Sequence, residues 1–115
     1  MKQKYVVLVG PIAGVEKYRE NFAGAESIAR KAFDCAFVWN PALMPAGNAL
    51  YVYMTLCFRH ISEASMFEIN GVYDSIVIAL PNIGEKSGAN VELAYARYLG
   101  LNVVTLEDVK KGLVK

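Results

Sequence analysis

The sequence predicts an α/β fold in which a parallel β-sheet is doubly wound, with helices on both of its faces. Two features support this. Short runs rich in Val, Ile and Leu alternate with longer segments whose apolar residues recur at three- and four-residue spacings. The short runs are apolar at nearly every position, which is typical of strands buried on both faces of a parallel sheet. At 115 residues, the chain is expected to form one domain over residues 1–115.

The first half of the chain predicts two strands and two helices. A strand is expected over residues 5–10, YVVLVG, and the apolar spacing of residues 15–33 predicts an amphipathic helix. A second short buried strand is expected at 35–39, CAFVW. The sequence NPALMPAGN at 40–48 combines Asn-Pro, a second Pro and a Gly, which predicts a loop. Residues 49–69 are mostly apolar and predict a long helix.

The second half continues the alternation. The pair Asn70 and Gly71 is expected to end the long helix, which is either continuous or broken near Ser62 to Ser65. After it come a third buried strand, a Gly-rich loop, a helix, a fourth strand and a short polar helix or tail, at residues 73–81, 82–90, 91–100, 101–106 and 107–115.

This alternation predicts right-handed crossovers and a three-layer, flavodoxin-like sheet of four or five parallel strands in the order 2-1-3-4(-5). The winding then reverses between the first and third strands, and ligands of such sheets bind beyond the carboxyl ends of the strands at that point. The loops that meet there are GPIAGV at 10–15 and LPNIGEKSGAN at 80–90. Neither matches a dinucleotide or phosphate-loop motif. One hypothesis is that the glycines of these two loops line a ligand pocket, and the other is that they only allow tight turns.

The composition of the chain argues against several classes of binding partner. With 20% charged residues and a formal net charge of +1, the chain offers no basic surface for a nucleic acid polymer. No apolar run reaches the roughly 20 residues of a membrane span, and the apolar start is expected to be a strand, not a signal peptide. Cys35 and Cys57 lack CxxC spacing and have only His60 as a co-ligand, so neither a metal site nor a cofactor is expected. Two buried thiols fit a reducing, cytoplasmic location.

Glu92 is the most informative candidate residue. It falls in the first turns of the helix expected to start near Ser87 to Asn90, where the helix dipole favours an ionised carboxylate. One interpretation is that it only stabilises the helix start. However, neighbours such as Ala89, Leu93 and Ala96 make this helix apolar around much of its circumference. Burying a carboxylate is costly unless it has a task or a partner, so a carboxylate directed into a pocket is the second interpretation.

Asp74 also has two interpretations. It stands directly before the apolar run SIVIAL, where Asp is a common turn residue. Alternatively, it bonds a ligand hydroxyl or raises the pKa of Glu92 through like-charge coupling. His60 lies within the long helix and is assigned no role.

Five segments spread through nearly the whole chain carry a family resemblance: VVLVGPIAG, YRENFAGA, NPALMP, YDSIVIALP and SGANVELAYARYLGLNVV. The last is the most specific, with Gly, three residues and then Glu opening a helix that ends in Leu-Gly before a strand. Together they resemble the nucleoside 2-deoxyribosyltransferase-like superfamily. Within it, the sequence is most similar to a small phage and bacterial family, the DUF4406-like proteins.

The resemblance implies cleavage or transfer of the N-glycosidic bond of a 2′-deoxynucleoside or its 5′-monophosphate. Glu92 aligns with the family nucleophile, which attacks the anomeric carbon as the base leaves and so forms a glycosyl-enzyme ester. Water or a second base then attacks this ester and releases the enzyme. Asp74 is implied near the sugar and the nucleophile. The residues implied in substrate binding are Gly10, Pro11 and Ile12 of the first loop, Ser87, Gly88 and Asn90 at the helix start, and Arg19 near a phosphate.

Two positions depart from the pattern of the relatives. Relatives commonly have Tyr where this chain has Val7, and Tyr5 lies on the same strand face one pair earlier. Relatives also tend to place Ser where this chain has Lys86, so Lys86 becomes a candidate phosphate contact. Val7 favours an alternative hypothesis, a non-catalytic nucleotide-binding or regulatory module with the same fold.

The resemblance also implies a homodimer or larger homo-oligomer in which a neighbour completes the pocket. The aromatic-rich segment LYVYMTLCF at 50–58 would supply such an interface, or it packs in the core. The expected partners are therefore a nucleoside or nucleotide and a second copy of the chain.

Overall fold

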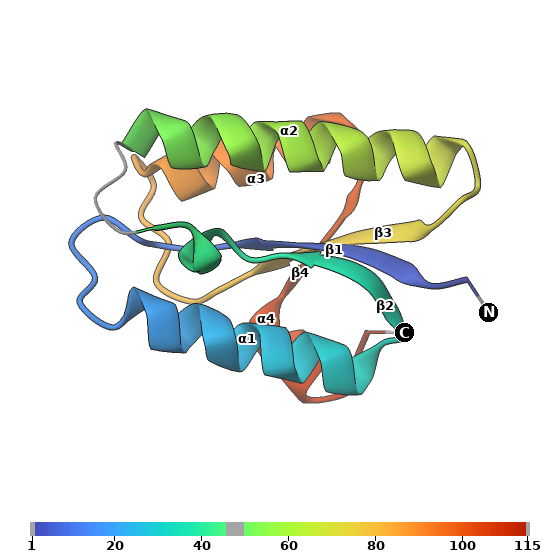
Figure 1. The fold of residues 1–115 in the computed structure, drawn as a ribbon, viewed down its shortest axis with the longest axis horizontal. Helices are drawn as coiled ribbons and strands as arrows, with labels where there is room; N and C mark the ends of the chain where they lie inside the picture. The colour runs from blue at the N-terminus through green and yellow to red at the C-terminus, as the bar shows by residue number, and fades with distance from the viewer. Residues whose placement is uncertain (1, 46–49, 115) are drawn as a thin grey trace.

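The computed structural model describes residues 2–45 and 50–114 and confirms the predicted α/β fold with its parallel sheet (Figure 1). The strands pair in the order β2-β1-β3-β4, as expected for flavodoxin-like winding. β1 and β3 pair residue for residue, from Lys4 opposite Asp74 to Val9 opposite Ala79, so their carboxyl ends are level. No fifth strand occurs in the described ranges. The strands are β1 (Lys4–Val9), β2 (Cys35–Trp39), β3 (Asp74–Ala79) and β4 (Asn102–Thr105).

Helices cover both faces of the sheet, which makes three layers (Figure 1). α2 (Leu50–Ile69) and α3 (Gly88–Tyr98) lie over one face, and α1 (Tyr18–Ala32) and α4 (Leu106–Lys110) lie over the other. A short 3-10 helix, η1 (Pro41–Leu43), follows β2. Of the described helices, none combines the length and apolarity needed to cross a membrane.

The core is divided by the sheet into two clusters because successive side chains of a strand point to opposite faces. In β1, Val6 and Leu8 face α1 together with Phe22, whereas Val7 and Val9 face α2 and α3. All five residues are almost completely buried. The continuous apolar run of β1 therefore reflects burial on both faces, as the sequence predicted.

The second strand differs from its prediction. β2 was expected to be buried, but it is an edge strand that pairs only with β1. Ala36 is exposed and Phe37 remains 39% exposed, because no further strand covers that side. A five-residue apolar run carries no signal that separates an edge from a central position.

The observed helix boundaries differ from the predicted ones by a few residues. α1 begins at Tyr18, because the residues before it form turns around Gly14, which has a φ of 75°. α2 is unbroken through Ser62 to Ser65, so the continuous alternative is correct. α3 begins at Gly88, within the start expected near Ser87 to Asn90, with Ser87 as its cap. The end of the predicted loop and the start of the predicted long helix, residues 46–49, lie outside the described residues.

Candidate functional site

The two loops that meet at the reversal of winding enclose a pocket of about 200 Å³, here called the Glu92 pocket. It lies beyond the carboxyl ends of β1 and β3, on the face covered by α2 and α3. The loop after β1, the start of α2 and the start of α3 form its walls. Its lining residues are Gly10, Pro11, Ile12, Ala13, Tyr53, Met54, Lys86, Ser87, Gly88, Ala89 and Glu92. Every predicted site residue except Asp74, Arg19 and Asn90 therefore lines this one pocket.

Glu92 is a buried member of the pocket wall. Its helix buries Ala89, Glu92, Leu93 and Ala96, which three- and four-residue spacing places on one face. Glu92 is only 9% exposed, and no ion pair to it occurs among the described residues. A surface residue that merely stabilises the helix start would lie on the opposite, solvated face.

Burial controls the protonation of Glu92. Removal of its carboxylate from water raises its pKa to about 7, and the Cys57 thiol partly opposes that rise. The carboxyl group therefore exists in comparable amounts as acid and as carboxylate near neutral pH. A side chain with this property can act as a nucleophile or can exchange a proton with a ligand.

The start of α3 is held by its own loop. The Ser87 hydroxyl donates to the Gly84 carbonyl over 2.6 Å and accepts from the Asn90 N–H over 3.2 Å. The Asn90 side chain donates to the Glu85 carbonyl over 2.8 Å. These two polar side chains thus order the loop, and Gly88 and Ala89, whose N–H groups belong to the first turn of α3, line the pocket.

Two glycines of the pocket lie at points of close approach, and the neighbours of Gly10 are core atoms whereas the neighbour of Gly88 is a flexible side chain. A Cβ atom at Gly10 would lie 2.8 Å from Leu80 Cβ and 3.1 Å from Phe22 Cζ, both in the core. A Cβ atom at Gly88 would lie 2.9 Å from the sulfur of Met54. These contacts explain why glycine occurs at both positions, without a positive φ at either.

Asp74 and Arg19 lie away from the pocket. Asp74 begins β3 opposite Lys4, about 16 Å along the strand from the carboxyl end, so its expected place beside the nucleophile is wrong. Its backbone N–H bonds to the Gln3 carbonyl, and its side chain is exposed. The Arg19 guanidinium donates to the carbonyls of Ala42 (2.8 Å) and Met44 (3.1 Å), which ties α1 to the segment after β2.

Comparison with known proteins gives one match. The family described as "Domain of unknown function (DUF4406)" matches residues 4–105, which include every element from β1 to β4. The chain belongs to the DUF4406 family. No curated protein and no solved structure matches it. The family description assigns no activity, so the function of this DUF4406 chain has to be argued from its pocket.

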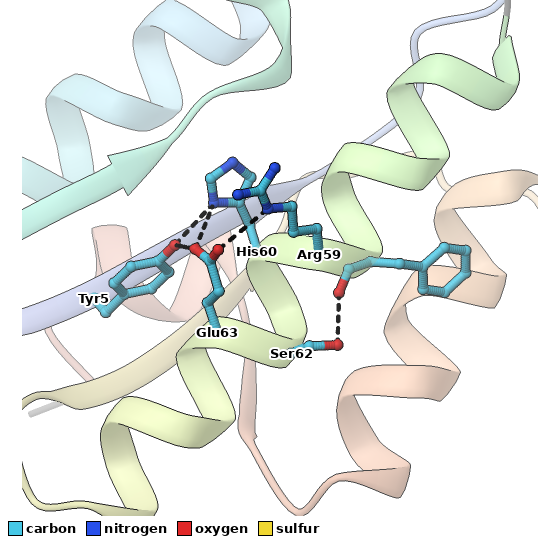
Figure 2. Close-up of polar contacts among 6 residues, drawn as sticks. Tyr5, Arg59, His60, Ser62 and Glu63 are labelled. Atoms are coloured by element: carbon cyan, nitrogen blue, oxygen red, sulfur yellow. Dashed lines mark hydrogen bonds and ion pairs between the residues drawn. The ribbon is translucent and has the colours of Figure 1, made fainter.

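At the position on β1 where relatives were expected to have a tyrosine, this DUF4406 chain has Val7. Val7 is fully buried and has no polar atom. The Tyr5 hydroxyl lies 2.8 Å from His60 Nδ1 and donates to Glu63 over 3.2 Å, as Figure 2 shows. Glu63 also binds Arg59. Tyr5 is therefore engaged with α2, and its hydroxyl is not available to Glu92.

Sequence reasoning missed the contribution of α2 to the pocket. Tyr53 and Met54 line it, and Cys57, one turn further, is buried in the same cluster as Ala89 and Leu93 of α3. The Nε1 atom of Trp39 at the end of β2 is buried and has no hydrogen-bond partner among the described residues. Tyr53, Cys57 and Ile61 do recur at four-residue spacing, but α2 is too apolar all round for that stripe to stand out.

A neighbouring cavity carries no ionisable side chain. A cavity of about 250 Å³ lies beside the Glu92 pocket on the α1 face and shares Pro11 with it. Its other lining residues are apolar or carboxamides, and none is ionisable: Val15, Asn21, Leu80, Pro81, Asn82 and Leu106. Nowhere in residues 2–45 and 50–114 do three His, Cys, Asp or Glu side chains gather as they would around a metal ion.

Proposed function

We propose that this DUF4406 protein cleaves or transfers the N-glycosidic bond of a 2′-deoxynucleoside or its 5′-monophosphate, with Glu92 as nucleophile. The observation that carries the proposal is the buried carboxylate of Glu92 in a pocket at the reversal of winding. It has no cationic partner in the described part of the chain. The spacing from Gly88 to Glu92, which resembles the deoxyribosyltransferase-like superfamily, supports the same assignment.

The proposed reaction has two steps. The ionised Glu92 attacks the anomeric carbon, the C–N bond breaks, and the base leaves with the bonding electrons and takes up a proton. The product is a deoxyribosyl ester of Glu92. Water, or a nitrogen of a second base, then attacks the same carbon and releases Glu92 as a carboxylate. Hydrolysis and transfer differ only in that second nucleophile.

The pocket fits the sugar part of such a substrate. At about 200 Å³, it is smaller than the roughly 300–1,000 Å³ usual for a whole ligand, so it has room for the deoxyribose and leaves the base outside. The N–H groups of Gly88 and Ala89 suit a 5′-hydroxyl or a 5′-phosphate at the positive end of α3. Lys86, exposed at the rim, adds a positive charge for a phosphate.

The pKa of Glu92 predicts the pH dependence of this reaction. The nucleophile must be ionised, and its pKa is about 7. The rate constant of the first step is therefore expected to rise with pH and to level off above neutrality.

One observation favours the second candidate function, a nucleotide-binding or regulatory module without catalysis. The described lining of the pocket contains Glu92 but no second carboxylic acid to protonate a departing base. Val7 also leaves Glu92 without a tyrosine neighbour on β1. The same pocket would then bind a nucleotide and leave its glycosidic bond intact.

We also propose a homodimer in which a second copy completes the base-binding side of the pocket. Support comes from the small volume of the pocket and from the apolar side chains on the outer surface of α2 and α3. Tyr51, Val91 and Tyr98 are each more than half exposed there. The unpaired Cys35 and Cys57 support our further proposal of a cytoplasmic location.

A base-release assay tests the proposed function. The protein is incubated with 2′-deoxynucleosides and their 5′-monophosphates, with and without a second base, and free base is measured by chromatography. Release by the wild type is expected, together with its loss in Glu92→Gln. Glu85→Gln is the matched control, because Glu85 is exposed in the same segment and, among the described residues, no ion pair or side-chain hydrogen bond is made by its carboxylate.

Two results would go against the enzyme hypothesis. Base release that persists in Glu92→Gln would show that Glu92 is not the nucleophile. Absence of release from every substrate, combined with a nucleotide-dependent rise in melting temperature, supports the binding module instead.

A further inference from the structure

The α1 face of the sheet carries a cavity of about 250 Å³ that the proposed function does not use, here called the α1-side cavity. It lies at the same end of the sheet as the Glu92 pocket, where α1 begins (Figure 1). β1 and β3 end level with each other. Pro11 follows β1 and Pro81 follows β3, and both line the cavity. Each face of the sheet therefore has a hollow at this end.

The walls of the α1-side cavity are mostly apolar. Val15 comes from the loop before α1, Leu80 follows β3, and Leu106 begins α4. Leu80 and Leu106 also belong to the apolar cluster that faces α1. None of the described residues that line the cavity is ionisable, and Glu107 and Lys110 line the adjoining hollow along α4. Because an unpaired charge is costly in apolar surroundings, a ligand of this cavity is expected to be uncharged.

Two residues with carboxamide side chains also line the cavity. Asn21 lies in the first turn of α1, and Asn82 lies in the loop after β3. Neither side chain forms a hydrogen bond within the described part of the chain. By contrast, the carboxamides of Asn40 and Asn90 are both hydrogen-bonded within the protein. The N–H and C=O groups of the Asn21 and Asn82 side chains are therefore available to a ligand.

The lining of the cavity defines a class of ligand. A carboxamide offers a donor beside an acceptor, so it pairs best with a ligand that carries an acceptor beside a donor, as Asn does with the edge of adenine. Apolar walls favour an aromatic or heteroaromatic body for the rest of the ligand. The volume is slightly below the roughly 300–1,000 Å³ usual for a whole ligand, so the ligand is expected to be small. A single ring with an amide edge combines these properties.

We propose that the α1-side cavity is a second ligand site of this DUF4406 protein, for a small uncharged ring compound with an amide edge, and that Asn21 and Asn82 bind that edge. The site is separate from the Glu92 pocket, since Pro11 is the one residue that the two described linings share. The proposal does not depend on the proposed reaction, because it involves neither Glu92 nor the start of α3.

The test is a titration of the protein with benzamide, uracil and benzoate, followed by NMR of the methyl groups. Benzamide carries a carboxamide on one ring, uracil carries the amide within its ring, and benzoate replaces the carboxamide of benzamide with a charged carboxylate. Benzamide and uracil are expected to shift the methyl signals of Val15, Leu80 and Leu106 until these signals saturate. Benzoate should require at least about a tenfold higher concentration, because its charge would be placed against apolar walls.

Substitutions of the two asparagines test their role. Asn21→Asp and Asn82→Asp keep the shape of the side chain but remove its N–H donor, and each should raise the Kd of benzamide about tenfold. Asn82→Gly removes the carboxamide altogether and suits the φ of 69° at this position, so it serves as a second variant. Asn102→Asp is the matched control, because Asn102 is exposed at the start of β4 and does not line the cavity. Glu92→Gln should bind benzamide like the wild type.

Four results would overturn the proposal. These are no shift of the three methyl signals with any probe, binding of benzoate as tight as that of benzamide, an unchanged Kd of benzamide in all three asparagine variants, and loss of benzamide binding in Glu92→Gln. The last result would place the probe in the Glu92 pocket. Melting temperatures of the variants show whether each is folded. Benzamide binding with the expected pattern of variants supports the second site whether or not the protein releases a base.

Discussion

Replacement of Glu92 by Gln is expected to stabilise the folded protein at neutral and alkaline pH. Burial raises the pKa of this carboxyl from 4.5 to about 7, which means that the folded state resists its ionisation. At about 1.4 kcal/mol for each tenfold change in a proton equilibrium, the penalty reaches about 3 kcal/mol once the group is fully ionised. Gln carries no charge at any pH and escapes this penalty.

The sign follows from proton linkage. Between about pH 4.5 and 7, the unfolded chain has lost this proton while the folded chain still holds it, so wild-type stability falls as pH rises. Stability contributed by the protonated group is fully present below about pH 4.5 and is lost as pH rises through about 7. The difference between Glu92→Gln and wild type should therefore grow from near zero to about 3 kcal/mol.

Urea unfolding at a series of pH values measures this difference. At alkaline pH, the expected gain corresponds to about 10 °C in melting temperature for a domain of this size. Glu85→Gln, at an exposed position, should differ from wild type by less than about 0.5 kcal/mol throughout. If the Glu92→Gln and wild-type stabilities differ by a constant amount from pH 4 to 8, Glu92 is not buried as described and the reasoning fails.

Four further substitutions test the packing of the fold and of the site. Gly10→Ala should destabilise by about 1–3 kcal/mol, because its Cβ would meet the core at 2.8 Å, while Gly24→Ala, in open space within α1, should stabilise by about 0.5–1 kcal/mol; chemical denaturation gives both signs. Ser87→Ala should cost about 1 kcal/mol through loss of the α3 cap and speed hydrogen exchange at the start of α3. Tyr5→Phe should cost about 1–2 kcal/mol by leaving its partners unpaired, yet leave the Glu92 titration unchanged; a moved midpoint would connect Tyr5 to the pocket.

The fold was predictable because its signals are local. Continuous apolar runs, helical periodicity and Gly or Pro breaks each depend on a few neighbouring residues, and together they limit the topology to one common winding. The run CAFVW alone does not predict the exposure of Phe37, whereas the predicted strand order does place this strand at the edge of the sheet. The exact first residue of α3 is set by its cap, Ser87, and several residues of the sequence near it could have served as that cap.

The candidate site was predictable in part for the same reason. Topology alone brings the loop at Gly10 and the loop at Gly88 to one edge of the sheet, and the pocket lies between them. Asp74 is the first residue of β3, whereas the pocket lies beyond the carboxyl end of that strand. The direction of the strand therefore separates Asp74 from the pocket. Cys57 on α2 and Leu93 on α3 belong to one buried cluster although they lie far apart in the sequence, and no local pattern indicates such a pair.

The central claim is that Glu92 forms a covalent bond with the sugar of a deoxynucleoside. The most direct measurement is mass spectrometry of protein quenched in acid during turnover, followed by peptide mapping. The proposed function predicts a deoxyribosyl adduct on the peptide that contains Glu92, present in the wild type and in Glu85→Gln and absent in Glu92→Gln. Base release without any adduct, or an adduct that survives in Glu92→Gln, would contradict it.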